Sequence, residues 1–241
     1  MSPSSDRWRL RAVLFDAGNT LVFLDYKRMA AGVGAALGLP LSGERLSSQA
    51  AEAAQAMERS GSDQERTTAY LEALFLGAGI PRGRLGEVRE CLARMHQEQH
   101  LWCSVPQTTR EALASLKAAG LRLGVVSNSE GRVHEALDAA GLREQFDVVV
   151  DSGVIGIEKP DPRIFQVALA QLGVAPEEAL YVGDVYEVDV RGARAAGIPA
   201  VLLVGPGDPQ RDCRTTISIG ELANEVLAEN RRSRRDSKES S

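Results

Sequence analysis

The sequence lacks the features that would tie it to a membrane or to nucleic acid. No apolar run approaches the roughly 18 residues of a membrane span. The start, MSPSSDRWRL, lacks the apolar core of a secretory signal. The net charge of −5 argues against a general nucleic-acid binder, because neutralising phosphates requires clustered Lys and Arg. We therefore expect a soluble, cytoplasmic protein that binds neither membranes nor nucleic acids.

Cysteine is also scarce. The three cysteines, Cys91, Cys103 and Cys213, are odd in number and widely spaced, and they form no CxxC pair. This pattern indicates neither a disulfide framework nor a zinc site. Reduced thiols are the expectation, which agrees with a cytoplasmic location.

What the sequence does contain is five short apolar runs separated by helical patterns. The runs are AVLF before Asp16 and those at 121–127, 146–152, 179–184 and 199–204. They are rich in Val and Leu and do not alternate, which is typical of strands covered on both faces of a parallel sheet. Helical patterns at 107–119, 130–140, 161–173 and about 187–196 lie between them. This alternation predicts a doubly wound α/β fold.

One interval breaks the alternation. Between about 25 and 101 there is no convincing strand, and the segments 30–39, 47–60, 65–79 and 86–102 read as amphipathic helices. The sequence thus predicts a Rossmann-like α/β core at 1–20 and 105–229, with a helical bundle inserted at 21–104. The last stretch, NRRSRRDSKESS, has no apolar residue, so we expect a disordered tail at 230–241.

Polar residues suited to ligand binding follow four successive predicted strands. In a parallel α/β sheet, ligands bind beyond the carboxyl ends of the strands, so these residues are expected to face one crevice. In chain order they are Asp16, then Ser127 and Asn128, then Lys159 in the sequence EKP, and finally Asp184 with Asp189.

These residue types together suit a phosphate beside a metal ion. Clustered carboxylates repel one another unless a cation joins them, and hard oxygen ligands of this kind suit Mg²⁺. Lys159 adds a fixed positive charge, and Ser127 and Asn128 add hydrogen-bond donors. One carboxylate would be free to attack phosphorus and form an aspartyl-phosphate.

Four segments resemble the motifs of the haloacid dehalogenase-like (HAD) hydrolase superfamily, over roughly residues 11–205. DAGNT at 16–20 resembles the family's DxDxT, and VVSN at 125–128 resembles its strand ending in Ser or Thr. EKPDPRIF at 158–165 resembles its lysine loop, and GDVYEVD at 183–189 resembles GDxxxxD. The inserted bundle at 21–104 resembles the helical cap of this family.

The resemblance implies a role for each site residue. Asp16 would be the nucleophile, Ser127 and Lys159 would bind the transferring phosphoryl group, and Thr20 would fix the loop after the nucleophile. Asp189 would support the metal or orient Lys159. The implied sets are Asp16, Ser127 and Lys159 for catalysis; Thr20, Ser127, Asn128 and Lys159 for substrate; and Asp16, the Gly18 carbonyl, Asp184 and Asp189 for Mg²⁺. The implied substrate is a small phosphorylated metabolite.

Gly18 departs from the family pattern. The family's phosphomonoesterases carry a second Asp at this position, which protonates the leaving oxygen and later activates water. Glycine retains the backbone carbonyl but has no side chain that can transfer a proton. General acid–base catalysis by such a side chain typically raises the rate by about 10²–10⁴-fold.

Three interpretations remain open. The first is a phosphatase with a good leaving group, such as an acyl phosphate, or with a substitute acid from the insertion: Asp25, Tyr26, His96 or His100. The second is a hydrolase of haloacids, whose enzymes lack GDxxxxD, or of phosphonates, which needs a cap lysine; the insertion offers only Lys27. The third is a weakly catalytic or non-catalytic phosphate-binding, regulatory protein. The sequence predicts no oligomeric state.

Overall fold

The computed structural model describes residues 10–57, 63–205 and 210–239. The chain divides into two compact units, one at Leu24–Cys103 and the other comprising Met1–Phe23 and Ser104–Ser241. The chain passes between them at strands β2 (Phe23–Leu24) and β3 (Trp102–Ser104), which pair as a small sheet. Residues 1–9 of the predicted core, 58–60 of the predicted helix 47–60 and 240–241 of the predicted tail lie outside the described residues.

The larger unit is built on a six-stranded parallel sheet of order β5-β4-β1-β6-β7-β8. The chain moves outward from β1 through β4 to β5, then crosses back to β6 on the other side of β1 and moves outward again. Doubly wound sheets bind ligands at such a reversal. The strands are β1 (Ala12–Phe15), β4 (Arg122–Ser127), β5 (Val148–Asp151), β6 (Ala179–Gly183), β7 (Ala200–Leu203) and β8 (Arg214–Thr216).

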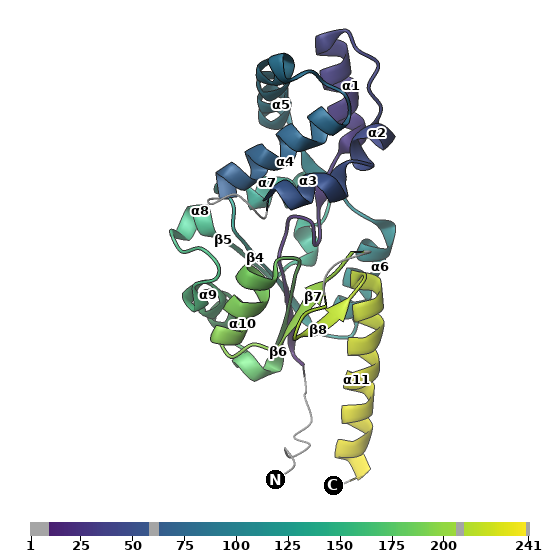
Figure 1. Cartoon of the computed structure of the whole chain (residues 1–241). Helices are drawn as coiled ribbons and strands as arrows, with labels where there is room; N and C mark the ends of the chain where they lie inside the picture. The colour runs from purple at the N-terminus through teal and green to yellow at the C-terminus, as the bar shows by residue number, and fades with distance from the viewer. Residues whose placement is uncertain (1–9, 58–62, 206–209, 240–241) are drawn as a thin grey trace. The chain divides into compact units, whose positions relative to one another are not determined.

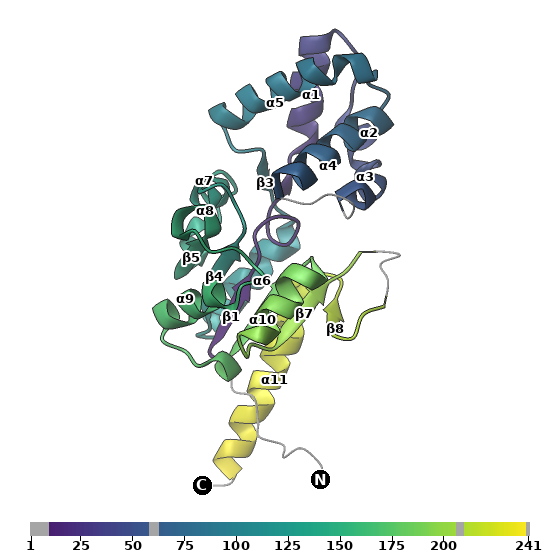
Figure 2. The same cartoon turned by 60° about the vertical axis from the view of Figure 1, so that its left-hand side comes forward.

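Both faces of this sheet are covered by helices. Helices α9 and α10 share a core with Leu14 and Tyr181 on one face, whereas α6 and α11 pack together on the other (Figures 1 and 2). Every residue of β1 is therefore buried, which explains its unbroken apolar run. The helices are α6 (Gln107–Ala118), α7 (Val133–Ala139), α8 (Ser152–Ile155), α9 (Pro162–Leu172), α10 (Arg191–Ala195) and α11 (Ile219–Glu239).

The predicted doubly wound fold is confirmed, and the structure differs from the prediction in two places. Strand β8 extends the sheet at its edge, but its sequence RTT has no apolar run that would reveal it. The predicted disordered tail at 230–241 is wrong for residues 230–239, because α11 continues to Glu239. That stretch contains neither Pro nor Gly and is rich in Arg, a good helix former, so an apolar face is not needed for it to continue a helix already begun.

The smaller unit is mainly helical and has its own core. The four predicted amphipathic segments are helices, and a short fifth helix lies between the first two. Met29, Leu46, Leu74 and Phe75 are fully buried at the centre of this unit. Its helices are α1 (Tyr26–Leu37), α2 (Gly43–Ser47), α3 (Ala50–Met57), α4 (Asp63–Gly77) and α5 (Leu85–Glu98). None of the helices described in either unit is both long and apolar enough to cross a lipid bilayer.

Helix α1 begins at a side-chain cap. The Asp25 carboxylate accepts a hydrogen bond from the Arg28 backbone N–H at 2.9 Å. The Arg28 guanidinium in turn donates to the carbonyl of Met95 in the last turn of α5 and to those of Gln99 and His100 just beyond it. Asp25 therefore has a structural role that fixes where α1 starts.

We expect Asp25→Ala to lower the free energy of unfolding by about 1 kcal/mol, the usual loss for removing an N-cap. Asp25→Asn keeps a cap oxygen and should lose less than half of that. Urea denaturation followed by circular dichroism measures both. Equal losses in the two variants would show that the charge of Asp25, rather than the cap, stabilises the unit.

Candidate active site

The residues predicted at four strand ends meet at the carboxyl edge of the parallel sheet. Asp16 directly follows β1, Ser127 is the last residue of β4, and Asp184 directly follows β6. Lys159 comes from the segment between α8 and α9. The register explains this meeting, because Phe15 pairs with both Val125 and Val182, so the three neighbouring strands end at similar heights.

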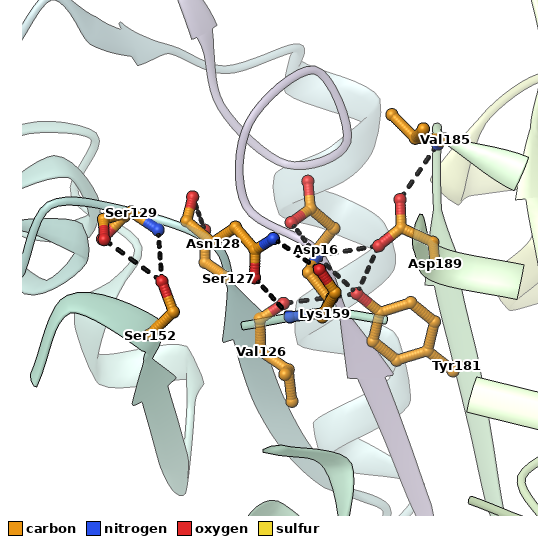
Figure 3. A network of polar contacts seen from close by, with 10 residues as sticks. All are labelled: Asp16, Val126, Ser127, Asn128, Ser129, Ser152, Lys159, Tyr181, Val185 and Asp189. Carbon is orange, nitrogen blue, oxygen red and sulfur yellow. Dashed lines mark hydrogen bonds and ion pairs between the residues drawn. The ribbon is translucent and has the colours of Figure 1, made fainter. Parts of the chain in front are cut away.

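The Lys159 ammonium lies at the centre of this site. Its Nζ atom is 2.6 Å from Asp16 Oδ1, 2.7 Å from Asp189 Oδ1 and 3.0 Å from the Tyr181 hydroxyl. Figure 3 draws these contacts as dashed lines. The lysine is only 4% exposed. A buried charge is tolerated only when it is paired and hydrogen-bonded, and here a partner is present for each of its three N–H bonds.

Burial and neighbouring charges shift the pKa values of the ionisable groups. Burial raises the pKa of Asp16 to about 6; the Lys159 charge opposes this rise and the Asp189 charge adds to it. Burial alone would lower the pKa of Lys159, but the Asp16 and Asp189 carboxylates raise it above its usual value. Burial, Asp16 and Asp189 raise the pKa of Asp184 well above its usual range. The site thus brings three carboxylates around one cation, an excess of negative charge.

The oxygen atoms left over suit a Mg²⁺ ion. Asp184 forms no ion pair with any described residue, and one oxygen of Asp16 is not engaged by Lys159. The Gly18 carbonyl accepts no hydrogen bond from the described part of the chain. These hard oxygens are the ligands that Mg²⁺ prefers, and a cation would relieve the carboxylate repulsion. The donor set therefore fits the predicted metal.

Asp189 is engaged by the protein through both of its oxygens. Oδ1 accepts from Lys159 and from the Tyr181 hydroxyl, and Oδ2 accepts from the Val185 backbone N–H at 2.9 Å. The residue lies in a single π-helical turn, η4 (Tyr186–Val190), and is 1% exposed. Of its two implied roles, orienting Lys159 has the direct contact to support it.

Asn128 holds the backbone of Lys159. Its side-chain oxygen accepts from the Lys159 N–H at 2.7 Å, and its side-chain nitrogen donates to the Lys159 carbonyl at 3.0 Å. The predicted donor to substrate therefore has both ends of its amide bound within the protein. Ser127 stands beside it, 4% exposed, with its hydroxyl 3.5 Å from the Asn128 carbonyl.

The loop after Asp16 is tightly folded. The Ala17 carbonyl accepts from the backbone N–H groups of Leu21 and Val22, and Asn19 has a positive φ of 53°. Gly18 is not among the positive-φ residues, so the backbone there does not require glycine. Thr20 is 1% exposed, and its hydroxyl has no hydrogen-bond partner in the described residues.

The four candidate substitute acids belong to the helical unit and make contacts within it. Asp25 caps α1, and the Tyr26 hydroxyl lies 2.6 Å from the hydroxyl of Tyr70. The Nδ1 atoms of His96 and His100 each accept a backbone N–H at 3.3 Å. Each of these side chains therefore contributes to the local structure of that unit.

Sequence reasoning missed Tyr181, which contacts both Lys159 and Asp189. The feature of the sequence that indicates its role is a tyrosine in an otherwise aliphatic buried strand, ALYVG. A buried tyrosine hydroxyl usually has a hydrogen-bond partner, so the residue pointed to a polar group inside the sheet.

Comparisons with known proteins agree with this geometry. A family model described as haloacid dehalogenase-like hydrolase matches residues 10–197. A phosphoserine phosphatase of Thermus thermophilus is 39% identical over 168 residues, 68% of this chain and 65% of its own length. A glyceraldehyde 3-phosphate phosphatase of Methanopyrus kandleri is 33% identical over 201 residues, covering 80% of this chain and 83% of the relative.

Among solved structures, that of a dehalogenase with an intermediate complex has a TM-score of 0.62 and 27% identity, covering 90% of this chain and 97% of the other. The chain spans less than two thirds of the length of several curated relatives, the Thermus protein included. The family model, however, matches most of the chain from the first strand to the helix after GDVYEVD. This protein belongs to the haloacid dehalogenase-like hydrolase family.

Proposed function

We propose that this protein is a Mg²⁺-dependent phosphatase that hydrolyses a small phosphorylated metabolite through an aspartyl-phosphate on Asp16. The observation that carries the proposal is the buried Lys159 ammonium held 2.6 Å from Asp16 at the carboxyl edge of the sheet, near Asp184, which forms no ion pair with the described residues. The names of the two relatives, phosphoserine phosphatase and glyceraldehyde 3-phosphate phosphatase, support a small phosphorylated substrate. The three cysteines are free thiols, which supports a cytoplasmic location because disulfides are rare there.

In the proposed reaction, Asp16 has a different role from Lys159 and Ser127. The Asp16 carboxylate attacks phosphorus, the bond to the leaving oxygen breaks, and water then cleaves the acyl phosphate. Lys159 and the Ser127 hydroxyl donate to the phosphoryl oxygens. Mg²⁺, when held by Asp16, Asp184 and the Gly18 carbonyl, supplies further neutralisation of charge. Phosphoryl transfer depends mainly on such positioning and electrostatic stabilisation.

Gly18 determines which phosphates are turned over well. Without an acid at this position, the leaving oxygen must depart as an anion or take its proton from elsewhere. We therefore propose that the preferred substrates have a good leaving group, as an acyl phosphate does. A substitute acid from the helical unit, Asp25, Tyr26, His96 or His100, is the alternative route to an alkyl phosphate.

The absence of an acid at Gly18 also favours a second candidate, a regulatory protein that binds phosphate and hydrolyses it slowly or not at all. The binding residues are retained, and only the proton-transfer group is missing. A substrate turned over faster than about 1 s⁻¹, a typical enzymatic rate, would exclude this candidate.

The similarity to a solved dehalogenase favours a third candidate, carbon–halogen hydrolysis. Asp184 and Asp189 argue against it, because they form the GDxxxxD segment that haloacid dehalogenases do not keep. Chloride release from a 2-haloacid in the absence of metal would establish this activity. The related phosphonate hydrolysis would need Lys27, the one lysine of the helical unit, as an amine nucleophile.

The nucleophile is tested with p-nitrophenyl phosphate, whose leaving group needs little protonation. We expect hydrolysis with Mg²⁺ that is lost on chelation, restored by added Mg²⁺, and reduced to the uncatalysed rate in Asp16→Asn. Asp147→Asn is the matched control, because Asp147 lies outside the site and Asn can still accept from the Leu123 N–H. Activity that persists in Asp16→Asn would remove Asp16 as the nucleophile.

The missing acid is tested by restoring it. Gly18→Asp should raise kcat on alkyl phosphates by about 10²-fold, the lower end for general acid–base catalysis, and should change p-nitrophenyl phosphate turnover much less. Gly18→Asn has a side chain of the same size that transfers no proton and should give no gain. If Gly18→Asp fails to exceed Gly18→Asn, another group already protonates the leaving oxygen.

A further inference from the structure

Four described side chains form hydrogen bonds with Lys159: those of Asp16, Asn128, Tyr181 and Asp189. Of these four residues, Tyr181 is the one that the family motifs do not cover. It is completely buried in β6, and its ring packs edge-to-face on Phe165 at a centroid distance of 4.9 Å. Only its hydroxyl reaches the polar cluster, where it lies 3.0 Å from Lys159 Nζ, 2.9 Å from Asp189 Oδ1 and 3.2 Å from the Val126 carbonyl. Figure 3 shows the hydroxyl directed at these groups.

Counting donors and acceptors fixes the direction of these hydrogen bonds. An ammonium group has three N–H donors and no lone pair, so Lys159 must donate to the tyrosine oxygen. The single O–H proton of Tyr181 then goes to Asp189 Oδ1 or to the Val126 carbonyl. The three N–H bonds of Lys159 are thereby assigned to Asp16, Asp189 and Tyr181.

This assignment determines what Lys159 offers to a phosphoryl group. Asp16 is the group that would carry the phosphoryl, so the N–H directed at Asp16 is the one that can pass to a phosphoryl oxygen. The other two N–H bonds stay on Asp189 and Tyr181, both buried and fixed by their own contacts. Without a tyrosine acceptor, the ammonium could rotate about its Cε–Nζ bond.

We propose that Tyr181 is a positioning residue, whose hydroxyl acts with Asp189 to fix the Lys159 ammonium so that its third N–H points at the phosphoryl group on Asp16. This inference rests on the proposed function, since it assigns a task to Lys159 in phosphoryl transfer. Tyr181 acts through Lys159 and Asp189, the side chains that its hydroxyl contacts.

The test is Tyr181→Phe, which removes one oxygen and keeps the ring that packs on Phe165. Losing one hydrogen bond to a charged group should lower kcat on p-nitrophenyl phosphate by about tenfold or more. KM should change by less than about twofold, because the lost interaction matters most in the transition state. A kcat within about twofold of wild type would overturn the proposal.

Thr216→Val is the matched control for losing a buried hydroxyl. Thr216 lies in the same sheet, away from the site, and its hydroxyl bonds to the Ser218 carbonyl at 3.0 Å and to Glu221 at 3.1 Å. It should lower the melting temperature and leave kcat unchanged. If Tyr181→Phe behaves in the same way, Tyr181 has only a structural role and the proposal fails.

Binding of orthovanadate in the presence of Mg²⁺ separates this proposal from the proposed function. Tyr181→Phe should bind vanadate about tenfold more weakly than wild type, because vanadate accepts the same N–H from Lys159. Equal affinities would overturn the positioning role. If wild type binds vanadate but hydrolyses no phosphate ester faster than Asp16→Asn, the phosphatase activity fails, while the comparison of vanadate affinities still decides the role of Tyr181.

Discussion

The whole site depends on the burial of one ammonium group. Lys159 is bonded to Asp16 after β1, to Tyr181 within β6 and to Asp189 in the turn after β6, while Asn128 at the end of β4 holds its backbone. A buried charge that loses a partner typically costs about 3–5 kcal/mol. The same contacts that form the proposed phosphate site therefore also hold three segments of the sheet edge together.

The fold and most of the site were accessible from the sequence for one physical reason. Strands buried on both faces leave continuous apolar runs, and a parallel arrangement brings the residues that follow those runs to one edge. Asp16, Ser127 and Asp184 are identifiable because each lies at the end of such a run, and Lys159 because it lies in the segment between the third run and the helical pattern that follows it. Their meeting is a consequence of topology and needs no knowledge of side-chain packing.

The features that escaped prediction depend on packing in three dimensions. The Asn128 clamp joins atoms 31 residues apart, and Tyr181 approaches Lys159 across 22 residues, so neither contact has a local pattern. Strand β8 is short and polar at the edge of the sheet, where burial imposes no apolar run. The helical continuation at 230–239 has no apolar residue to indicate it, because α11 has already begun on the buried residues Leu222 and Val226.

In the proposed function, the glycine at position 18 would affect the lifetime of the phosphorylated protein as well as the choice of substrate. In the proposed two-step reaction, the group that protonates the leaving oxygen would also deprotonate the water that cleaves the aspartyl-phosphate. Its absence would slow the second step whatever the leaving group was in the first. With a good leaving group, the first step would be faster than the second, and the chain would spend most of each cycle phosphorylated on Asp16. The phosphorylated form, more than the free protein, would then be the one that other molecules encounter.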